Sequence, residues 1–465
     1  MNLVLAVDFL AAGILLFAVL AKGFERTLPL AAFLLLLFPY ESQIRIPGLF
    51  DLTTQRILII ELVVLYLALG RTRNGEGGTE KLPQWKLILL LVGWMLFSSA
   101  NSVVPLVSFK STLSQVFDFA VPYYIFARAI SKAETVHKIL FAFFASMCVL
   151  SVFGYFEIYQ GWSVLSLFPV APHRFAGMPG EVTDRGLRAQ ATFGTSIMFG
   201  TALAVAIPMG LYLLTTAKST GRKVFLWSAV LLMFLDIYKT GSRGAWIAMI
   251  LSLAMLFSFG RGSMRRMLAT IVILTAMVLI VRPGVGETIV NLYRATQNPN
   301  TDQGASYQWR YALYGIAKRE LSKDLGRALW GFGPESFYFL GLEGEFQGAV
   351  WKFETCDSEV VELLMDTGCV GFLIVATLLA RAAFFSFRNS QKMTSPASTM
   401  CLVLFVNILT FCFMMTNVEI FWGQQSYMLW ILMALSLIYP KLALSASKSE
   451  EPAAIGHQSI GSLAF

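Results

Sequence analysis

Apolar runs of about twenty residues recur along most of the chain, and they limit the possible folds more than any other feature. About 20 apolar residues suffice for a helix to cross the hydrocarbon core of a bilayer. Charged residues form only 14% of the chain, whereas a soluble domain carries roughly 25%. We therefore predict an all-α, polytopic integral membrane protein with about 12–14 transmembrane helices. The predicted spans are residues 4–22, 27–40, 55–70, 84–101, 113–131, 136–157, 194–215, 224–240, 244–260, 265–281, 359–384, 398–416 and 420–439.

The connections between these runs alternate in charge. Loops rich in Lys and Arg stay on the cytoplasmic side of a membrane. The basic connections, which we predict to be cytoplasmic, are residues 71–86, 132–138, 217–223, 261–266 and 388–392. The segments between them, which we expect to face outward, are residues 40–54, 102–112, 158–193, 240–244, 282–358 and 416–425. This alternation accounts for the net charge of +8 without nucleic-acid binding, and it places the amino terminus outside.

Two of the outward segments are too long to be simple turns. We predict one transmembrane domain over residues 1–440, with outward loops at 158–193 and 282–358, followed by a disordered cytoplasmic tail over residues 441–465. Residues 306–326 predict an amphipathic helix that lies over the membrane domain, because apolar side chains recur there at helical spacing. These side chains are Trp309, Leu313, Ile316, Ala317 and Leu321.

Three arginines in the outward segments need an explanation, because positive charge is biased towards the cytoplasm. Arg188 closes the first long loop, Arg243 lies in the turn at residues 240–244, and Arg310 opens the predicted amphipathic helix. A guanidinium group is always charged, and its planar set of donors fits phosphate oxygens. We expect the three to meet at the membrane boundary and to bind a lipid-linked pyrophosphate. The alternative is that each arginine pairs with a structural acid or anchors its helix at the interface.

Four stretches resemble motifs of the bacterial O-antigen ligase and O-antigen polymerase superfamily, which includes exopolysaccharide polymerases. They are LRAQATFGTSIMFGTALA (187–204), KTGSRGAWIAM (239–249), QWRYALYGIAKRELSKDLGRALWGFGPESF (308–337) and CDSEVVELLMDTGCVGFL (356–373). The resemblance covers roughly residues 185–385 and rests on the order and spacing of these stretches. It implies a C-type glycosyltransferase-like architecture in the bacterial inner membrane, with an active site that faces the periplasm or the exterior.

The resemblance also implies a reaction, the transfer of a glycan from a polyprenyl (undecaprenyl) pyrophosphate to an acceptor hydroxyl. Arg188, Arg243 and Arg310 match the family's arginine positions and would bind the pyrophosphate, with Arg243 also a candidate catalytic residue. Arginines neutralise such a leaving group without an ion. The implied partners are the lipid-linked glycan, the lipid bilayer, and other polysaccharide assembly proteins such as a flippase and a chain-length regulator.

The fourth stretch departs from the family pattern at its start. Many ligases carry a His-Asn pair there, whereas this chain has Asp357 and Ser358. Asp357, or else Glu359, would then accept the proton of the acceptor hydroxyl. The alternative is that Asp357 only caps the helix that begins there. The departure favours a polymerase of lipid-linked repeat units over a ligase that transfers the glycan to lipid A-core or another acceptor.

Metal ions and cofactors are not predicted. The three histidines, His137, His173 and His457, are too dispersed to build a His-rich metal site, and no Gly-rich phosphate loop indicates ATP. A transporter of polysaccharide or lipid-linked glycan is the second class of function considered, because ionisable residues within apolar runs often mark a transport path. These residues are Glu61, Asp118, Lys239, Glu362 and Asp366.

Overall fold

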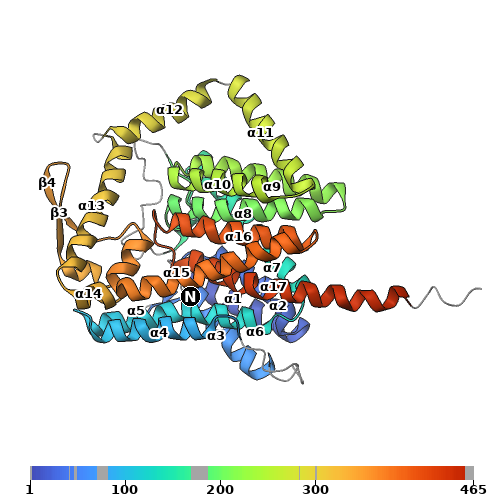
Figure 1. Ribbon diagram of the computed structural model, residues 1–465, viewed down its shortest axis with the longest axis horizontal. Coiled ribbons are helices and arrows are strands. Elements are labelled where there is room, and N and C mark those ends of the chain that lie inside the picture. The colour runs from blue at the N-terminus through green and yellow to red at the C-terminus, as the bar shows by residue number, and fades with distance from the viewer. Residues whose placement is uncertain are drawn as a thin grey trace, which may run out of the picture.

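The computed structural model describes residues 3–40, 42–44, 46, 50–70, 82–168, 187–281, 283–298 and 301–455. The protein is 78% helical and only 4% strand, which confirms the all-α fold class. Most helices run side by side in one bundle (Figure 1). The bundle helices are α1 (Leu3–Lys22), α2 (Phe24–Leu37), α3 (Thr54–Leu65), α4 (Trp85–Ala100), α5 (Pro105–Asp118), α6 (Ala120–Ala129), α7 (Ala133–Gln160), α8 (Ser196–Thr216), α9 (Thr220–Lys239), α10 (Arg243–Phe259), α15 (Glu359–Lys392), α16 (Ala397–Met414) and α17 (Gly423–Ile455). Helix α11 (Ser263–Val281) leaves the bundle obliquely and leads to α12 (Pro283–Gln297) (Figure 1).

Six helices in the described part of the chain are long and apolar enough to cross a membrane, namely α1, α7, α8, α15, α16 and the first part of α17. Two shorter helices, α4 and α10, are also apolar. The protein is therefore a polytopic membrane protein, as the apolar runs predict. The expected span at 113–131 is instead two helices, α5 and α6, because the chain leaves helical geometry at Phe119. Pro122 follows in the first turn of α6, where proline, which lacks an N–H donor, is tolerated.

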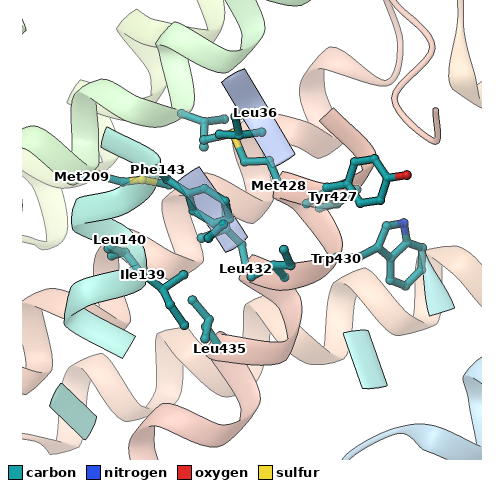
Figure 2. Packing of buried hydrophobic residues seen from close by; sticks show 14 of the residues in the cluster. Leu36, Ile139, Leu140, Phe143, Met209, Tyr427, Met428, Trp430, Leu432 and Leu435 are labelled. Atoms are coloured by element: carbon teal, nitrogen blue, oxygen red, sulfur yellow. The ribbon is translucent and has the colours of Figure 1, made fainter. Parts of the chain in front are cut away.

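Helix α8 is the most enclosed of the membrane helices, with 94% of its span buried inside the protein. Small residues allow its neighbours to approach closely, as in other membrane bundles. At Gly200 an added Cβ would lie 2.7 Å from the Cβ of Ala245 in α10, and at Gly210 it would lie 2.4 Å from the ring of Phe144 in α7. Figure 2 shows the adjoining core, where Phe143 of α7 lies near Leu432 of α17. This packing fixes α7, α8 and α10 relative to one another.

Helix α15 is interrupted at Gly368, which has a φ of 66°. A Cβ at this position would lie 2.3 Å from the carbonyl oxygen of Leu329, so only glycine fits. The amides of Phe332 and Gly333 donate to the carbonyls of Met365 and Asp366, over 2.6 and 3.0 Å. Irregular backbone at membrane depth is tolerated only where protein groups satisfy it. The glycine-bearing turn after α14 therefore completes the broken helix.

The long segment between α11 and α15 lies at one end of the bundle, where α13, α14 and the β3–β4 hairpin gather (Figure 1). Its helix α13 confirms the predicted amphipathic helix, but the apolar stripe packs differently from the expectation. Leu313 and Ile316 are buried with Phe353 of the hairpin and Met365 of α15 in a second small core. The elements of this segment are α12 (Pro283–Gln297), α13 (Asp302–Ser322), α14 (Leu325–Trp330), a 3-10 turn (Phe337–Leu340), β3 (Leu342–Phe346) and β4 (Ala349–Phe353).

The remaining short elements lie outside the long helices. They are the antiparallel strands β1 (Gln43–Ile44) and β2 (Leu52–Thr53), a π-helical turn (Tyr66–Gly70) and a 3-10 turn (Val164–Leu167). At the carboxyl end, α17 continues to Ile455, past the boundary at residue 440 where a disordered tail was expected. Alanine, leucine, lysine and glutamate in this stretch favour a helix. The rest of the expected tail lies outside the described residues.

Candidate functional site

Arg188 lies against the end of α9. Its Nε donates to the carbonyl of Thr240 over 2.7 Å, and the amide of the next residue, Ala189, donates to the carbonyl of Lys239 over 3.3 Å. Thr240 is the residue that ends α9. The arginine therefore satisfies a carbonyl at a helix carboxyl terminus, where positive charge is favoured.

The turn at residues 240–244 brings Arg243 to the same place. Gly241 has a φ of 59°, and a Cβ there would lie 3.5 Å from Nε of Arg188. Arg243 is the first residue of α10. Its Nη1 donates to the hydroxyl of Thr296, near the end of α12. The turn thus joins Arg188 on one side to α12 on the other.

Arg310 reaches the site from α13. Its Nη2 donates to the carbonyl of Asn417 over 3.4 Å, and its Nη1 donates to the hydroxyl of Ser306 over 2.8 Å. Asn417 also lies beside α10, because a Cβ at Gly244 would be 3.5 Å from its Cγ. Asn417 therefore lies between Gly244, the neighbour of Arg243 in the chain, and the guanidinium group of Arg310. These contacts bring the three predicted arginines to adjacent positions at one end of the bundle.

One nitrogen of Arg310 has no acceptor among the described residues. Its Nε is buried and makes no hydrogen bond there. A buried charged donor without an acceptor costs more free energy than a neutral one. An anionic ligand at this position would supply the missing acceptor.

Asp357 lies half-buried between β4 and α15. Helix α15 begins at Glu359, with Ser358 as its N-cap residue, so Asp357 lies one residue before the capping position. Burial raises the pKa of Asp357 above its ordinary value, and the positive charge of Arg310 partly offsets this effect. The structure thus brings Asp357 within electrostatic reach of Arg310.

Comparison with known families addresses the same region. Residues 228–376 match the family model described as O-antigen ligase. The resemblance to the O-antigen ligase and polymerase superfamily is confirmed. The matched stretch includes Arg243, Arg310 and Asp357, whereas Arg188 precedes it and joins the site through Thr240. No curated protein matches the chain.

Glu359 plays a different part from Asp357 within the stretch that matches the O-antigen ligase family. It is 2% exposed, and its Oε2 accepts hydrogen bonds from the amides of Ile420 and Phe421 over 2.6 and 3.0 Å. Its own amide donates to the carbonyl of Val418 over 3.3 Å. Glu359 therefore holds the loop that carries Asn417. An oxygen already engaged by two amides is a poor proton acceptor, so Asp357 is the better placed of the two candidates.

A cavity of about 100 Å³ lies on the other side of Glu359. Four further acidic residues line it, together with the rings of Tyr40 and Trp422 and the buried Arg56–Asp118 pair. The acidic residues are Glu335, Glu362, Asp366 and Glu419. Within the described chain, no three His, Cys or acidic side chains are arranged to hold a metal ion.

The candidate transport residues are divided between several places. Asp118, Glu362 and Asp366 line this cavity, and Asp118 is paired there with Arg56. Lys239 instead lies at the end of α9, with its ammonium group 5.7 Å from the centre of the Tyr159 ring. Glu61 lies within α3. Only three of the five residues therefore share this cavity.

His137, the histidine within the described residues, lies away from this site. His137 contacts the hydroxyl of Tyr212 through Nδ1 over 2.5 Å, and it lies near the start of α7, whereas the arginines lie toward the other end of that helix. His173 and His457 lie outside the described residues, as does half of the first long loop, residues 169–186.

Sequence reasoning overlooked two residues of the site. Asn417 lies in the outward segment at 416–425, which was recognised without singling out any side chain. Glu157, which accepts hydrogen bonds from the amides of Gln190 and Ala191 in the loop of Arg188, lies at the end of the predicted span at 136–157. An ionisable residue at the end of an apolar run was the available signal for Glu157.

Proposed function

We propose that the protein is a polymerase of lipid-linked oligosaccharide repeat units in surface polysaccharide biosynthesis. Its donor is a glycan on polyprenyl pyrophosphate, and its acceptor is a hydroxyl on a second lipid-linked repeat unit. The observation that carries this proposal is the chain of contacts from Arg188 through Thr240 to the Arg243 turn, and from there through Asn417 to Arg310. The match to the O-antigen ligase family supports a glycosyltransferase-like reaction at this site.

In the proposed reaction the acceptor oxygen attacks the anomeric carbon of the donor sugar. The bond between that carbon and the pyrophosphate oxygen breaks, and the pyrophosphate leaves with the electron pair. The three guanidinium groups neutralise the charge that develops on it. The proton of the acceptor hydroxyl passes to a carboxylate oxygen of Asp357. The products are a lengthened lipid-linked glycan and polyprenyl pyrophosphate.

Asp357 is suited to this task by its surroundings. Its carboxyl group is half-buried, and its raised pKa makes the carboxylate a stronger base than an exposed aspartate. The nearby positive charge of Arg310 opposes that rise and favours the ionised carboxylate. In our proposal, Glu359 contributes by holding the loop that carries Asn417.

A ligase is the second candidate, because the matching family model is described as O-antigen ligase. In that case lipid A-core or another acceptor replaces the second repeat unit. The position of Asp357 and Ser358, where many ligases carry His-Asn, favours the polymerase. The site would face the periplasm from the bacterial inner membrane, beside partners such as a flippase and a chain-length regulator.

An assay with a single substrate separates the two functions. The purified protein is placed in liposomes with one lipid-linked repeat unit and no other acceptor. We expect ladders of lengthened lipid-linked glycan. Transfer that occurs only after a non-identical acceptor is added would show a ligase and refute the polymerase.

A further inference from the structure

Glu157 lies in the last turn of α7 and is almost completely buried. Its Oε2 accepts hydrogen bonds from two consecutive main-chain amides, those of Gln190 and Ala191, over 2.7 and 2.9 Å. These amides follow Arg188 by two and three residues in the same loop. Hydrogen bonds to a carboxylate are roughly twice as strong as those between neutral groups. Glu157 is therefore a strong attachment point for the segment that carries Arg188.

The attached segment has a conformation that the local sequence does not favour. Ala191 has a φ of 49°, in the left-handed region that residues with a Cβ rarely adopt. Such a conformation persists only where the surroundings hold it in place. Glu157 holds the amide of Ala191 itself, and Nε2 of Gln424 donates to the carbonyl of the next residue, Thr192, over 2.8 Å. The loop is thus shaped by its contacts with α7 and α17.

On its other side the same loop rests on α9 through Arg188 and Ala189, which contact the carbonyls of Thr240 and Lys239. Arg188 is consequently held between two attachments, α9 and the Glu157 carboxylate. We propose that Glu157 is a positioning residue that sets the guanidinium of Arg188 for the pyrophosphate of the donor. This inference rests on the proposed function, and it adds a residue outside the stretch that matches the O-antigen ligase family.

The chain offers a matched control at the opposite end of the bundle. Oε1 of Glu25 also accepts hydrogen bonds from two consecutive amides, those of Ser131 and Lys132, over 3.0 and 3.1 Å. These residues lie at the start of α7, whereas Glu157 lies at its end. Glu25 is half-buried and also accepts from the hydroxyls of Ser131 and Thr135. Glu25→Ala thus also removes two amide contacts from a carboxylate, but only Glu157 contacts the loop that carries Arg188.

The first experiment measures binding and turnover in nanodiscs. Undecaprenyl pyrophosphate is the binding probe, and a lipid-linked repeat unit is the substrate for kcat and KM. We expect Glu157→Ala to weaken binding of the probe and to lower kcat/KM by about 10- to 100-fold, the range expected when a group is displaced but not removed. Glu157→Gln should lose much less, because its amide oxygen can accept from the same two amides. Glu25→Ala should leave binding and kcat/KM unchanged.

The second experiment tests whether Glu157 acts through Arg188. In an Arg188→Ala background, Glu157→Ala should change kcat/KM by less than about twofold, because the group that it positions is absent. Full, multiplicative losses from the two substitutions would overturn the proposal. If Glu157→Ala does not fold, Glu157→Asp, with a shorter side chain, takes its place in the cycle.

The outcomes also distinguish this inference from the function on which it rests. If the wild-type protein binds the probe and lengthens glycans while Glu157→Ala behaves like Glu25→Ala, the positioning role is refuted and the proposed function stands. If the wild-type protein neither binds the probe nor transfers glycan, the proposed function is refuted and the positioning role falls with it.

Discussion

The Nε of Arg188 donates to the carbonyl of Thr240 over 2.7 Å, although the two residues are 52 positions apart in the chain. Thr240 ends α9 and lies in the turn that starts α10 with Arg243. Two stretches that resemble separate family motifs therefore form one structural unit. The same contact gives Arg188 a structural role at a helix carboxyl terminus, beside the ligand-binding role that we propose.

Removal of Arg243 or Arg310 should abolish most transfer. We expect Arg243→Ala and Arg310→Ala to lower kcat by about 10²–10³-fold, the loss typical of removing one donor that stabilises developing negative charge. Lysine at either position should restore only part of the rate, because an ammonium group lacks the planar pair of donors. The measurement is glycan lengthening in liposomes with a lipid-linked repeat unit.

An arginine just beyond the opposite end of α10 provides the control for this experiment. Arg261 is exposed and contacts Gln391 through Nη2 over 3.0 Å, so Arg261→Ala should keep the wild-type rate. In cells, the Arg243→Ala variant should accumulate lipid-linked repeats on the outer leaflet. If the lipid-linked repeats no longer reached the outer leaflet in this variant, a transporter would be favoured instead.

The acid limb of the pH–rate profile should depend on Arg310. Asp357 must be ionised to accept the proton, so the rate falls as the pH drops through its pKa. The charge of Arg310 lowers that pKa against the effect of burial. Arg310→Gln should therefore move the acid limb to higher pH in the residual activity, measured as kcat/KM against pH. An unchanged limb would show that Asp357 is not the group that titrates, and Asp357→Asn should remove the limb altogether.

Local patterns predicted the membrane fold and singled out the three arginines, because hydropathy and the bias of positive charge are properties of short segments. The amphipathic stripe on α13 is also a local pattern, but its partner, Phe353 of the hairpin, is far along the chain, so the packing could not be predicted. The attachment of Glu359 to the amides of Ile420 and Phe421 likewise joins residues that are far apart in the chain. Main-chain groups carry no sequence signal, and a side chain that binds them is recognisable only in the fold.

Gly368 should be irreplaceable in α15. Its φ of 66° is unfavourable for any residue with a Cβ, and an alanine Cβ would lie 2.3 Å from the carbonyl oxygen of Leu329. We expect Gly368→Ala to lower the apparent Tm in detergent by about 5 °C or more. Gly93→Ala in α4 is the matched control, because nothing lies within 4 Å of its added Cβ. Equal Tm values for the two variants would show that the turn after α14 does not depend on this glycine.

The buried pair of Arg56 and Asp118 provides the sharpest test of the transport alternative. Nε and Nη2 of Arg56 contact the two carboxylate oxygens over 3.0 and 2.6 Å, and the hydroxyl of Tyr427 donates to Oδ1 of Asp118 over 2.6 Å. Asp118→Asn leaves a buried, unbalanced arginine and should cost about 3–5 kcal/mol of stability. Arg56→Met with Asp118→Leu removes both charges and should recover much of this loss.

The double variant then separates structure from transport. If the pair only stabilises the bundle, the variant that regains the wild-type Tm should also regain glycan lengthening, because no proton or ion needs to pass through Asp118. If Asp118 belongs to a transport path, the stable double variant should remain inactive, since its polar group is gone. We expect glycan lengthening to return together with stability, because Arg56 and Asp118 already have hydrogen-bond partners within the protein. Both quantities are measured in the same liposomes.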